Sequence, residues 1–354
     1  MPRALAAPDK FKGTATAGAV ARAIAAGAAR AGWSATELPM SDGGEGLLDV
    51  FGGANRRDTV TGPLGVSLTA KWRLDAEPAG GGVPTAVIEM AQAAGLDRVG
   101  GRDGNDPLTA STRGVGELVL AALASGARRI VIGCGGSATT DGGAGALEVL
   151  GQPERLAGVE VIVACDVTAS FVEAAARFAP QKGASPAQVA VLEERLRALA
   201  ASYLTTFGRD VARMPGSGAA GGLAGGLAAI GGRLVSGFDL VASLAGLDAQ
   251  LEDADAVITG EGCLDAESFS GKVVGGIWRR CADHPTLCVA GRTTSAGLQA
   301  AETAGLTVVG LTERFGEAAS LSRPLDLVAI VAVEWLEHLE AGGSTGEIVS
   351  ARRP

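Results

Sequence analysis

Residues 128–151 read RRIVIGCGGSATTDGGAGALEVLG and contain the pattern that decides the fold. The β-branched run at 130–132 predicts a buried strand. Glycines, small hydroxyl residues and Asp141 follow, and a second glycine pair opens a segment in which Ala, Leu and Val recur with helical spacing. A strand, a Gly-rich turn and a helix in this order are typical of an α/β protein with parallel strands.

The same order of strand, turn and helix recurs along the chain. Five more short apolar runs that end in turn residues are RALAAPD (3–9), VEVIVACD (159–166), DAVITGEG (255–262), PTLCVAG (285–291) and LTVVGL (306–311). Strands that alternate with helices predict parallel sheets with helices on both faces. Ligands of such sheets collect at the carboxyl ends of the strands, so we expect the functional residues just after each run.

The chain is expected to form two α/β domains. Its 354 residues exceed what one hydrophobic core usually spans. Residues 62–90 break the alternation, since they read as short strands of period two joined by Pro/Gly turns. We therefore expect a discontinuous parallel-sheet domain made of residues 1–61 and 235–354, with a second α/β domain, residues 62–234, inserted into it.

The composition excludes several classes of partner. The chain has 30 Lys and Arg against 39 Asp and Glu, a formal charge of −9, and no basic run with interleaved aromatic residues. Such a chain is repelled by nucleic acid and by anionic membranes. The uncharged run 214–232 is largely glycine and too weakly apolar to span a bilayer. We expect small-molecule substrates, with no nucleic acid and no membrane as partner.

Cysteine usage and the N-terminal residues predict a cytoplasmic protein. Five cysteines, an odd number, are widely spread and lie mostly in apolar runs, as reduced thiols do. Residues 1–13 lack the continuous apolar stretch of a signal peptide. The two histidines, His284 and His338, are not spaced as metal ligands, so a mechanism that depends on histidine is not expected.

The turn at 133–143 is the richest candidate site. Small hydroxyl side chains and bare amides can hold a polyol, a carboxylate or a phosphate, and Asp141 can accept a proton from a hydroxyl. In the alternative reading Asp141 only caps the following helix. The density of Gly, Ser and Thr favours the functional reading, and the candidate ligand-binding side chains are Ser137, Thr139 and Thr140.

Four further turns carry charged residues at predicted strand ends or helix starts. Lysine beside a helix start suits an anion, and a carboxylate between glycines can approach a ligand closely. Each pattern also fits an ordinary solvated turn or a helix cap. The candidates are Lys12 in APDKFKG (7–13), Asp42 in MSDGGEG (40–46), Asp166 in ACDVT (164–168) and Lys182 in APQKGAS (179–185).

Residues 257–272, VITGEGCLDAESFSGK, suit a metal and a nucleotide phosphate. Carboxylate oxygens of Glu261 and Asp265 are the hard ligands that Mg²⁺ prefers, and Lys272 can neutralise phosphoryl oxygens. The alternative is a capping acid beside a surface lysine. No Walker-type phosphate loop and no Rossmann glycine fingerprint with an acidic partner occur in the chain.

The Gly-rich run 215–227, PGSGAAGGLAGGL, leaves two interpretations open. Backbone amides around Gly216, Ser217 and Gly218 could cradle phosphates, or the glycines could let two helices pack closely.

Taken together, these segments resemble the bacterial glycerate kinases that phosphorylate D-glycerate with ATP. The resemblance runs from residue 6 to residue 272 and more weakly beyond. The matching segments, in order, are APDKFKG, MSDGGEG, STRGVGEL (111–118), GGSATTDGGAGAL (135–147), CDVT, PQKGA, GSGAAGGL and ITGEGCLDAESFSGK.

The resemblance implies a fold, a reaction and cofactors. The implied fold has two α/β domains, one Rossmann-like and one inserted, with the active-site cleft between them. The implied reaction transfers the γ-phosphoryl group of ATP, with Mg²⁺, to D-glycerate and yields 2-phosphoglycerate in preference to 3-phosphoglycerate. A kinase of another small hydroxy acid and a catalytically silent ligand-binding homologue are the alternatives, and both a monomer and a homodimer remain open.

Roles for individual residues follow from the needs of phosphoryl transfer, which are positioning and neutralisation of charge. We predict catalytic roles for Asp141, Asp42 and Lys12, substrate binding by Ser137, Thr139, Thr140 and Lys182, nucleotide binding by Gly216, Ser217, Gly218 and Lys272, and metal binding by Asp166, Glu261 and Asp265.

The chain departs from the family pattern at three places. The family usually has an Asn-Pro-Leu segment and a Gly-Pro-rich turn at the place where this chain reads ASFVEAAARFAPQKGA (169–184). It also has a longer loop where this chain has only GQPERLAG (151–158). Cys263 stands where the family commonly has arginine. The first two changes bear on the shape of the substrate loops, and the third removes a cation beside the predicted metal ligands.

Overall fold

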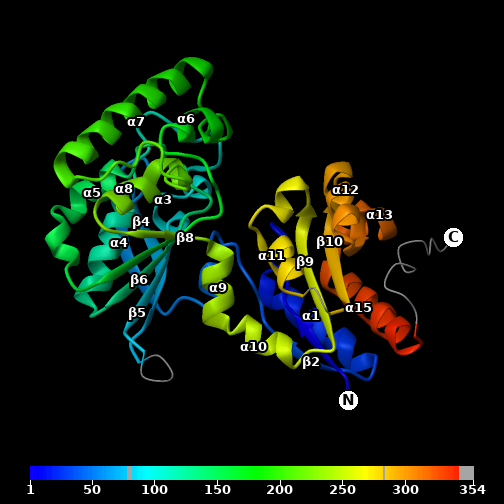
Figure 1. The fold of residues 1–354 in the computed structure, drawn as a ribbon. Coiled ribbons are helices and arrows are strands. Elements are labelled where there is room, and N and C mark those ends of the chain that lie inside the picture. The colour runs from blue at the N-terminus through cyan, green and yellow to red at the C-terminus, as the bar shows by residue number, and fades with distance from the viewer. Residues whose placement is uncertain (78–81, 282–283, 343–354) are drawn as a thin grey trace. The chain divides into compact units, whose positions relative to one another are not determined.

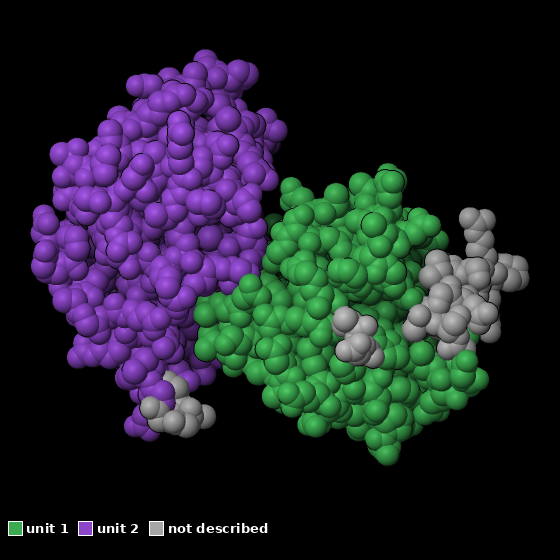
Figure 2. All heavy atoms as spheres, viewed as in Figure 1, with its two compact units in different colours: residues 1–42, 238–354 green, residues 43–237 purple. Residues whose placement is uncertain are grey.

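The computed structural model describes residues 1–77, 82–281 and 284–342, which fold into two compact α/β units (Figure 1). Unit 1 consists of Met1–Asp42 and Phe238–Pro354, and unit 2 of Gly43–Gly237 (Figure 2). The expected domain boundary after residue 61 thus falls within unit 2. The reason is strand β3, Arg56–Thr61, which pairs along its whole length with the next strand of that unit.

Unit 1 is built on a five-stranded sheet of order β11-β10-β9-β1-β2, in which every pairing is parallel. Its strands are β1 (Arg3–Ala6), β2 (Ser34–Glu37), β9 (Ala256–Leu264), β10 (Thr286–Thr293) and β11 (Thr307–Gly310). Its helices are α1 (Ala17–Arg30), α9 (Gly237–Ala245), α10 (Leu247–Glu252), α11 (Val273–Arg280), α12 (Ser295–Ala304), α13 (Leu311–Phe315), α14 (Glu317–Ser322) and α15 (Pro324–Glu340), with a 3₁₀ turn η5 (Ala266–Phe269).

Alternation along β10 shows how both faces of this sheet are covered. Leu287 and Val289 join a buried cluster with residues of α1 and α15, whereas Cys288 and Ala290 join another with residues of α11 and α12. Successive side chains of a strand point to opposite faces, so an uninterrupted apolar run is what a doubly covered strand requires.

Unit 2 contains a six-stranded sheet of order β3-β4-β5-β6-β7-β8. The strands are β3 (Arg56–Thr61), β4 (Ser67–Asp75), β5 (Thr85–Glu89), β6 (Arg129–Gly133), β7 (Glu160–Ala164) and β8 (Arg233–Val235). Pairings are antiparallel from β3 to β5 and parallel from β5 to β8. The predicted period-two segment at 62–90 contains β4 and β5.

The helices of unit 2 are short, apart from α4 and α7. They are α2 (Leu47–Val50), α3 (Ala91–Ala94), α4 (Arg113–Ala124), α5 (Ala144–Leu150), α6 (Glu173–Phe178), α7 (Pro186–Phe207) and α8 (Leu223–Ala229), with 3₁₀ turns η1 (Leu96–Val99), η2 (Pro153–Leu156), η3 (Pro180–Lys182) and η4 (Ala219–Gly222). Ser185 begins α7 with a capping box, since its Oγ accepts from the Gln188 amide and the Gln188 side chain accepts from the Ser185 amide.

The prediction of a two-unit α/β protein with parallel sheets is confirmed. The six apolar runs singled out in the sequence are strands β1, β6, β7, β9, β10 and β11. Among the described helices, none is both long and apolar enough to cross a membrane.

Candidate functional site

The segment Ser137–Asp141, here called the SATTD turn, follows β6 in unit 2 and is held by a buried lysine. Lys182 Nζ donates to Ser137 Oγ at 2.8 Å and to the carbonyl oxygen of Thr139 at 2.6 Å. The side chain is almost fully buried, at 3% exposure. Burial lowers the pKa of Lys182 to about 7, against the opposing effect of Asp141. The predicted substrate lysine is therefore brought to the predicted substrate turn.

A second clamp on the SATTD turn comes from Asn105. Its Nδ2 donates to the carbonyl oxygens of Ala138, at 3.0 Å, and of Lys182, at 2.8 Å. The hydroxyl oxygens of Thr139 and Thr140 are buried, and neither has a hydrogen-bond partner among the described residues. Buried polar atoms normally find a partner, so these two hydroxyls are candidates for hydrogen bonds to a ligand or to water.

Asp141 lies just before α5 and joins the first turn of that helix to the start of α4. Its Oδ2 accepts from the amide and the hydroxyl of Thr112, both at 2.8 Å, and from the Gly145 amide at 3.2 Å. Its Oδ1 accepts from the Gly143 amide at 3.1 Å. The capping role that the sequence left open is thus present, and Oδ1 keeps the capacity for a further donor such as a substrate hydroxyl.

The Gly-rich run packs backbone against backbone. A Cβ added at Gly221, whose φ is +67°, would lie 2.0 Å from the carbonyl oxygen of Thr139. The Ser217 side chain is fully buried and its Oγ lies within hydrogen-bond distance of the carbonyl oxygens of Val211 and Met214. Of the two interpretations of this run, close packing is therefore observed, between the run and the SATTD turn.

Asp166 follows β7 in unit 2. Its Oδ1 accepts from the Gly237 amide at 2.8 Å and from Ser236 Oγ at 3.2 Å. The other two predicted metal ligands, Glu261 and Asp265, belong to unit 1. The structure therefore does not bring the three together within one unit.

Unit 1 carries a second group of charged residues at the carboxyl ends of β1 and β9. We call Asp9, Lys10, Asp42, Glu261 and Lys272 the carboxylate–lysine cluster. The Asp9 amide donates to the carbonyl oxygen of Gly260 at 2.8 Å, which places Asp9 next to β9. Lys10 Nζ lies 3.7 Å from Asp9 Oδ1 and 3.9 Å from Asp42 Oδ1.

The carboxyl groups of Asp9, beside β9, and of Glu261, on β9, both have raised pKa values. Burial raises the pKa of Asp9 to about 6, with Lys10 opposing and Asp42 adding to the shift. Burial also raises the pKa of Glu261 to about 7, with Ser268 and Lys272 opposing and Asp9 and Asp265 adding. Glu261 Oε1 is buried, with no hydrogen-bond partner among the described residues. A cation at this place would relieve both carboxylates.

The rest of the 257–272 segment is arranged around this cluster. Asp265 caps η5 by accepting from the amides of Glu267 and Ser268, at 2.9 and 3.1 Å. Lys272 Nζ lies 3.4 Å from Glu267 Oε2. Burial would lower the pKa of Lys272, but Asp265 and Glu267 outweigh it and raise that pKa above its ordinary value. Lys12, the remaining charged residue among those predicted, is exposed.

Comparison with known proteins shows the family of the chain. The sequence model of the glycerate kinase family matches residues 4–153 and 152–323. The chain belongs to the glycerate kinase family. Glycerate 2-kinase of Escherichia coli K12 is 38% identical over 328 residues, which cover 81% of this chain and 84% of that protein. The uncharacterized Mycobacterium bovis protein Mb2228c is 43% identical over 84% of this chain and 83% of its own length.

A solved structure supports the same membership. The crystal structure of a Salmonella typhimurium LT2 protein assigned as glycerate kinase 2 superposes with a TM-score of 0.80 and 32% identity, over 96% of this chain and 99% of that chain. Membership in the glycerate kinase family places the chain among kinases that act on an alcohol group. The family resemblance stated from the sequence is thus confirmed.

Magnesium can be tested against the residues of this glycerate kinase family member. Within the described residues no group of three or more His, Cys, Asp or Glu side chains could hold a metal ion. Mg²⁺ is commonly bound through one or two carboxylates, with substrate phosphates and water completing its shell. Asp9 and Glu261, with the unpartnered buried oxygen of Glu261, fit that requirement.

Several residues that shape these two groups were not selected from the sequence. Asp9 and Lys10 lie in the APDKFKG segment, from which only Lys12 was taken, and their position after a predicted strand was a usable signal. Asn105 had no such signal, because its partners Ala138 and Lys182 lie far away in the chain. Thr112 lies in the matching segment STRGVGEL (111–118), but its contact with Asp141 could not be read from that segment.

Proposed function

We propose that this chain is an ATP-dependent glycerate kinase that forms 2-phosphoglycerate from D-glycerate. In the reaction a bond forms between the 2-hydroxyl oxygen of glycerate and the γ-phosphorus. The bond from that phosphorus to the leaving ADP oxygen breaks, and the hydroxyl proton passes to a carboxylate. The relative from Escherichia coli, named glycerate 2-kinase, supports the choice of the 2-hydroxyl.

The observation that carries the proposal is the carboxylate–lysine cluster. Phosphoryl transfer needs positive charge against the phosphates and carboxylates that hold a divalent cation. Lys10 and Lys272 supply positive charge at the carboxyl ends of β1 and β9, and the buried Glu261 carboxylate lacks a partner for Oε1 among the described residues. Asp9 and Glu261 would hold Mg²⁺, which when bound neutralises charge on the phosphoryl oxygens.

The SATTD turn is proposed to hold glycerate. Asp141 Oδ1 would accept the hydroxyl proton or orient the hydroxyl, because its Oδ2 is already occupied by three donors. The buried hydroxyls of Thr139 and Thr140 would donate to the substrate's oxygens. Lys182 sets the position of Ser137 and of the Thr139 carbonyl and adds positive charge when protonated.

The cellular setting of this reaction is proposed to be the cytoplasm. All five cysteines are free thiols, three of them buried. Free thiols are the rule in a reducing compartment, which is also where ATP is available.

The test is a coupled assay of ADP release with D-glycerate, L-glycerate and other small hydroxy acids, followed by phosphorus NMR of the product. We expect turnover with D-glycerate that requires Mg²⁺, and a product with phosphorus coupled to the proton at C2. ATP hydrolysis that no hydroxy acid stimulates would contradict the kinase proposal, and coupling to C3 protons would contradict the 2-position.

A further inference from the structure

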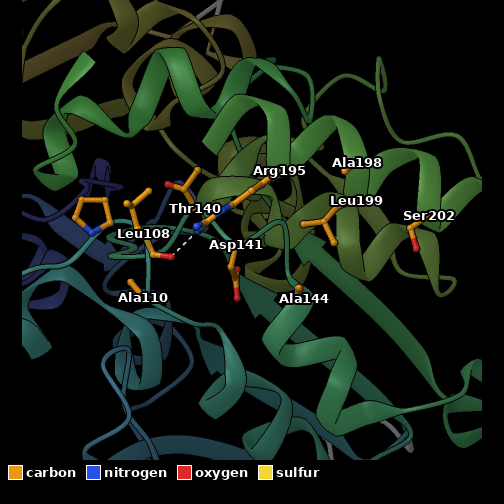
Figure 3. Close-up of a pocket in the computed structure, with 10 residues that line it drawn as sticks. Leu108, Ala110, Thr140, Asp141, Ala144, Arg195, Ala198, Leu199 and Ser202 are labelled. Atoms are coloured by element: carbon orange, nitrogen blue, oxygen red, sulfur yellow. Dashed lines mark hydrogen bonds between the residues drawn. The ribbon is translucent and has the colours of Figure 1, made fainter. Parts of the chain in front are cut away.

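Unit 2 contains an open pocket of about 520 Å³ beside the SATTD turn (Figure 3). Side chains of α7 line one side of it, and the turn and the start of α5 line another, as Figure 3 shows. The residues that line it are Pro107, Leu108, Ala110, Thr140, Asp141, Ala144, Arg195, Ala198, Leu199 and Ser202. A cavity of this size is in the range of small-molecule sites.

The chemistry of the lining does not suit glycerate. Six of the ten lining residues have apolar side chains, and among the others only Arg195 is a cation. Glycerate has three carbons, a carboxylate and two hydroxyls, so it would leave most of the pocket unfilled and bury little apolar surface. The phosphoryl donor, in contrast, carries a planar, largely apolar base that such a lining can sandwich.

We infer that this pocket binds the nucleoside part, base and ribose, of the phosphoryl donor. The inference rests on the proposed kinase function, which requires a nucleoside triphosphate. It adds a site outside the residues predicted for nucleotide binding, and Ser217 among those is fully buried against backbone carbonyls.

Arg195 offers a planar guanidinium group on which the base can stack. Its Nη1 donates to the carbonyl oxygen of Leu108 at 2.7 Å, which holds the guanidinium at the edge of the pocket. A planar guanidinium stacks well on an aromatic ring, and the side chains of Leu108 and Leu199 give the base apolar contacts. Ser202, on the exposed side of α7, places a hydroxyl where a ribose hydroxyl can bond to it.

The position of the pocket also fits a donor site. Asp141 lines the pocket and belongs to the turn that is proposed to orient the glycerate hydroxyl. The two substrates of a phosphoryl transfer must bind next to each other, because transfer requires the attacking oxygen and the phosphorus to be in contact. A nucleoside in this pocket would place the donor beside the turn that is proposed to hold the acceptor.

The experiment compares a variant in which a larger side chain fills the pocket with a variant that carries the same substitution outside the pocket. Ala198 lines the pocket and is exposed on α7, whereas Ala201 is exposed on the same helix and does not line it. We expect Ala198→Phe to raise KM for ATP by at least about tenfold, with KM for glycerate within about twofold of wild type. Ala201→Phe should leave both KM values and the melting temperature unchanged.

Binding measurements separate this inference from the kinase proposal. Calorimetric titration should show ATP binding to wild type and to Ala201→Phe, displacement by adenosine, and binding weakened about tenfold in Ala198→Phe. An unchanged ATP affinity in Ala198→Phe, a rise in KM for glycerate alone, or failure of adenosine to displace ATP would each overturn the inference. If wild type phosphorylates no acid but these titrations behave as expected, the proposed function fails and the nucleoside pocket stands.

Discussion

The ammonium group of Lys182 donates a 2.8 Å hydrogen bond to Ser137 Oγ across 45 residues of sequence. The bond ties η3 to the SATTD turn, and the same ammonium group holds the Thr139 carbonyl. Lys182→Met should therefore loosen the turn and raise KM for glycerate about tenfold or more. Steady-state kinetics at saturating ATP check this, and an unchanged KM would remove Lys182 from the substrate site.

The same lysine predicts a pH dependence of stability. The pKa of Lys182 is about 7 in the folded chain, against an ordinary value of 10.5. Between these values the unfolded chain holds a proton that the folded chain has lost, so the free energy of unfolding rises with pH. From pH 7 to pH 9 wild type should gain about 1 to 2 kcal/mol relative to Lys182→Met. Urea unfolding at the two pH values measures this gain. The control is Lys71→Met, at an exposed lysine.

Asp141 offers a test that separates catalysis from structure. Asp141→Asn alters a carboxylate that accepts four hydrogen bonds, so it should lower both stability and kcat, the latter by about 10²- to 10⁴-fold if Asp141 moves the proton. Thr112→Val removes the hydroxyl that donates to Asp141 and accepts from the Ala146 amide, and should cost about 1 to 3 kcal/mol of stability. Its kcat should stay within about threefold of wild type. Equal losses of kcat in the two variants would show that Asp141 acts only through structure.

The fold could be predicted largely because its central strands are buried on both faces. Strands β6 and β10 contain the apolar runs 130–132 and 287–290, which the sequence displays directly. Strand β2, SATE, is exposed at both ends and lies at the sheet edge, so no apolar run reveals it. Strand β3, RRDTVT, is likewise a charged edge strand, and for that reason the expected domain boundary fell after it rather than before it.

The candidate site could be predicted as a set of residues but not as a set of bonds. Turn composition singled out Ser137, Thr139 and Lys182. Lys182 donates its hydrogen bonds to the turn, and its burial lowers its pKa to about 7. Both properties depend on packing between segments that are distant in the chain. Spacing along a chain carries no information on such contacts.

Glu261 should give stability the opposite dependence on pH. Its pKa is about 7 in the folded chain against an ordinary 4.5, so between these values the folded chain holds the extra proton. The Glu261 contribution to the free energy of unfolding therefore falls as pH rises from 4.5 to 7, and Glu261→Gln should remove that contribution while leaving the smaller one of Asp9, whose pKa is about 6. The variant should also need more Mg²⁺ for half-maximal activity, whereas Glu267→Gln, at an exposed neighbour, should not. If stability depends on pH, and activity on Mg²⁺, in the same way in wild type and in Glu261→Gln, a role of Glu261 in binding Mg²⁺ is excluded.

Gly221 tests whether the Gly-rich run supports the SATTD turn. Alanine there would need a positive φ and would place Cβ 2.0 Å from the Thr139 carbonyl oxygen. Gly208 has a similar φ, +70°, and no heavy atom within 4 Å of an added Cβ. Gly208→Ala should thus cost about 1 to 2 kcal/mol for the backbone alone. Gly221→Ala should cost more than about 3 kcal/mol and reduce glycerate binding, as urea unfolding and kinetics can show.

The strand next to Cys263 carries an arginine, Arg292. Cys263 on β9 and Arg292 on β10 are register partners, so their side chains leave the sheet on the same face. Glu261, two residues earlier on β9, shares that face. We expect this guanidinium on the neighbouring strand to supply the positive charge that the family resemblance leads us to expect at position 263.

Moving the arginine from position 292 to position 263 tests whether Arg292 compensates for the missing arginine. Arg292→Met should raise KM for ATP about tenfold, because a cation near the phosphates is lost. Cys263→Arg added to Arg292→Met should return KM to within about threefold of wild type. Cys263→Arg alone places two guanidinium groups side by side and should lower stability by about 0.5 kcal/mol. Normal ATP kinetics in Arg292→Met would show that the charge at this edge of β9 is not needed.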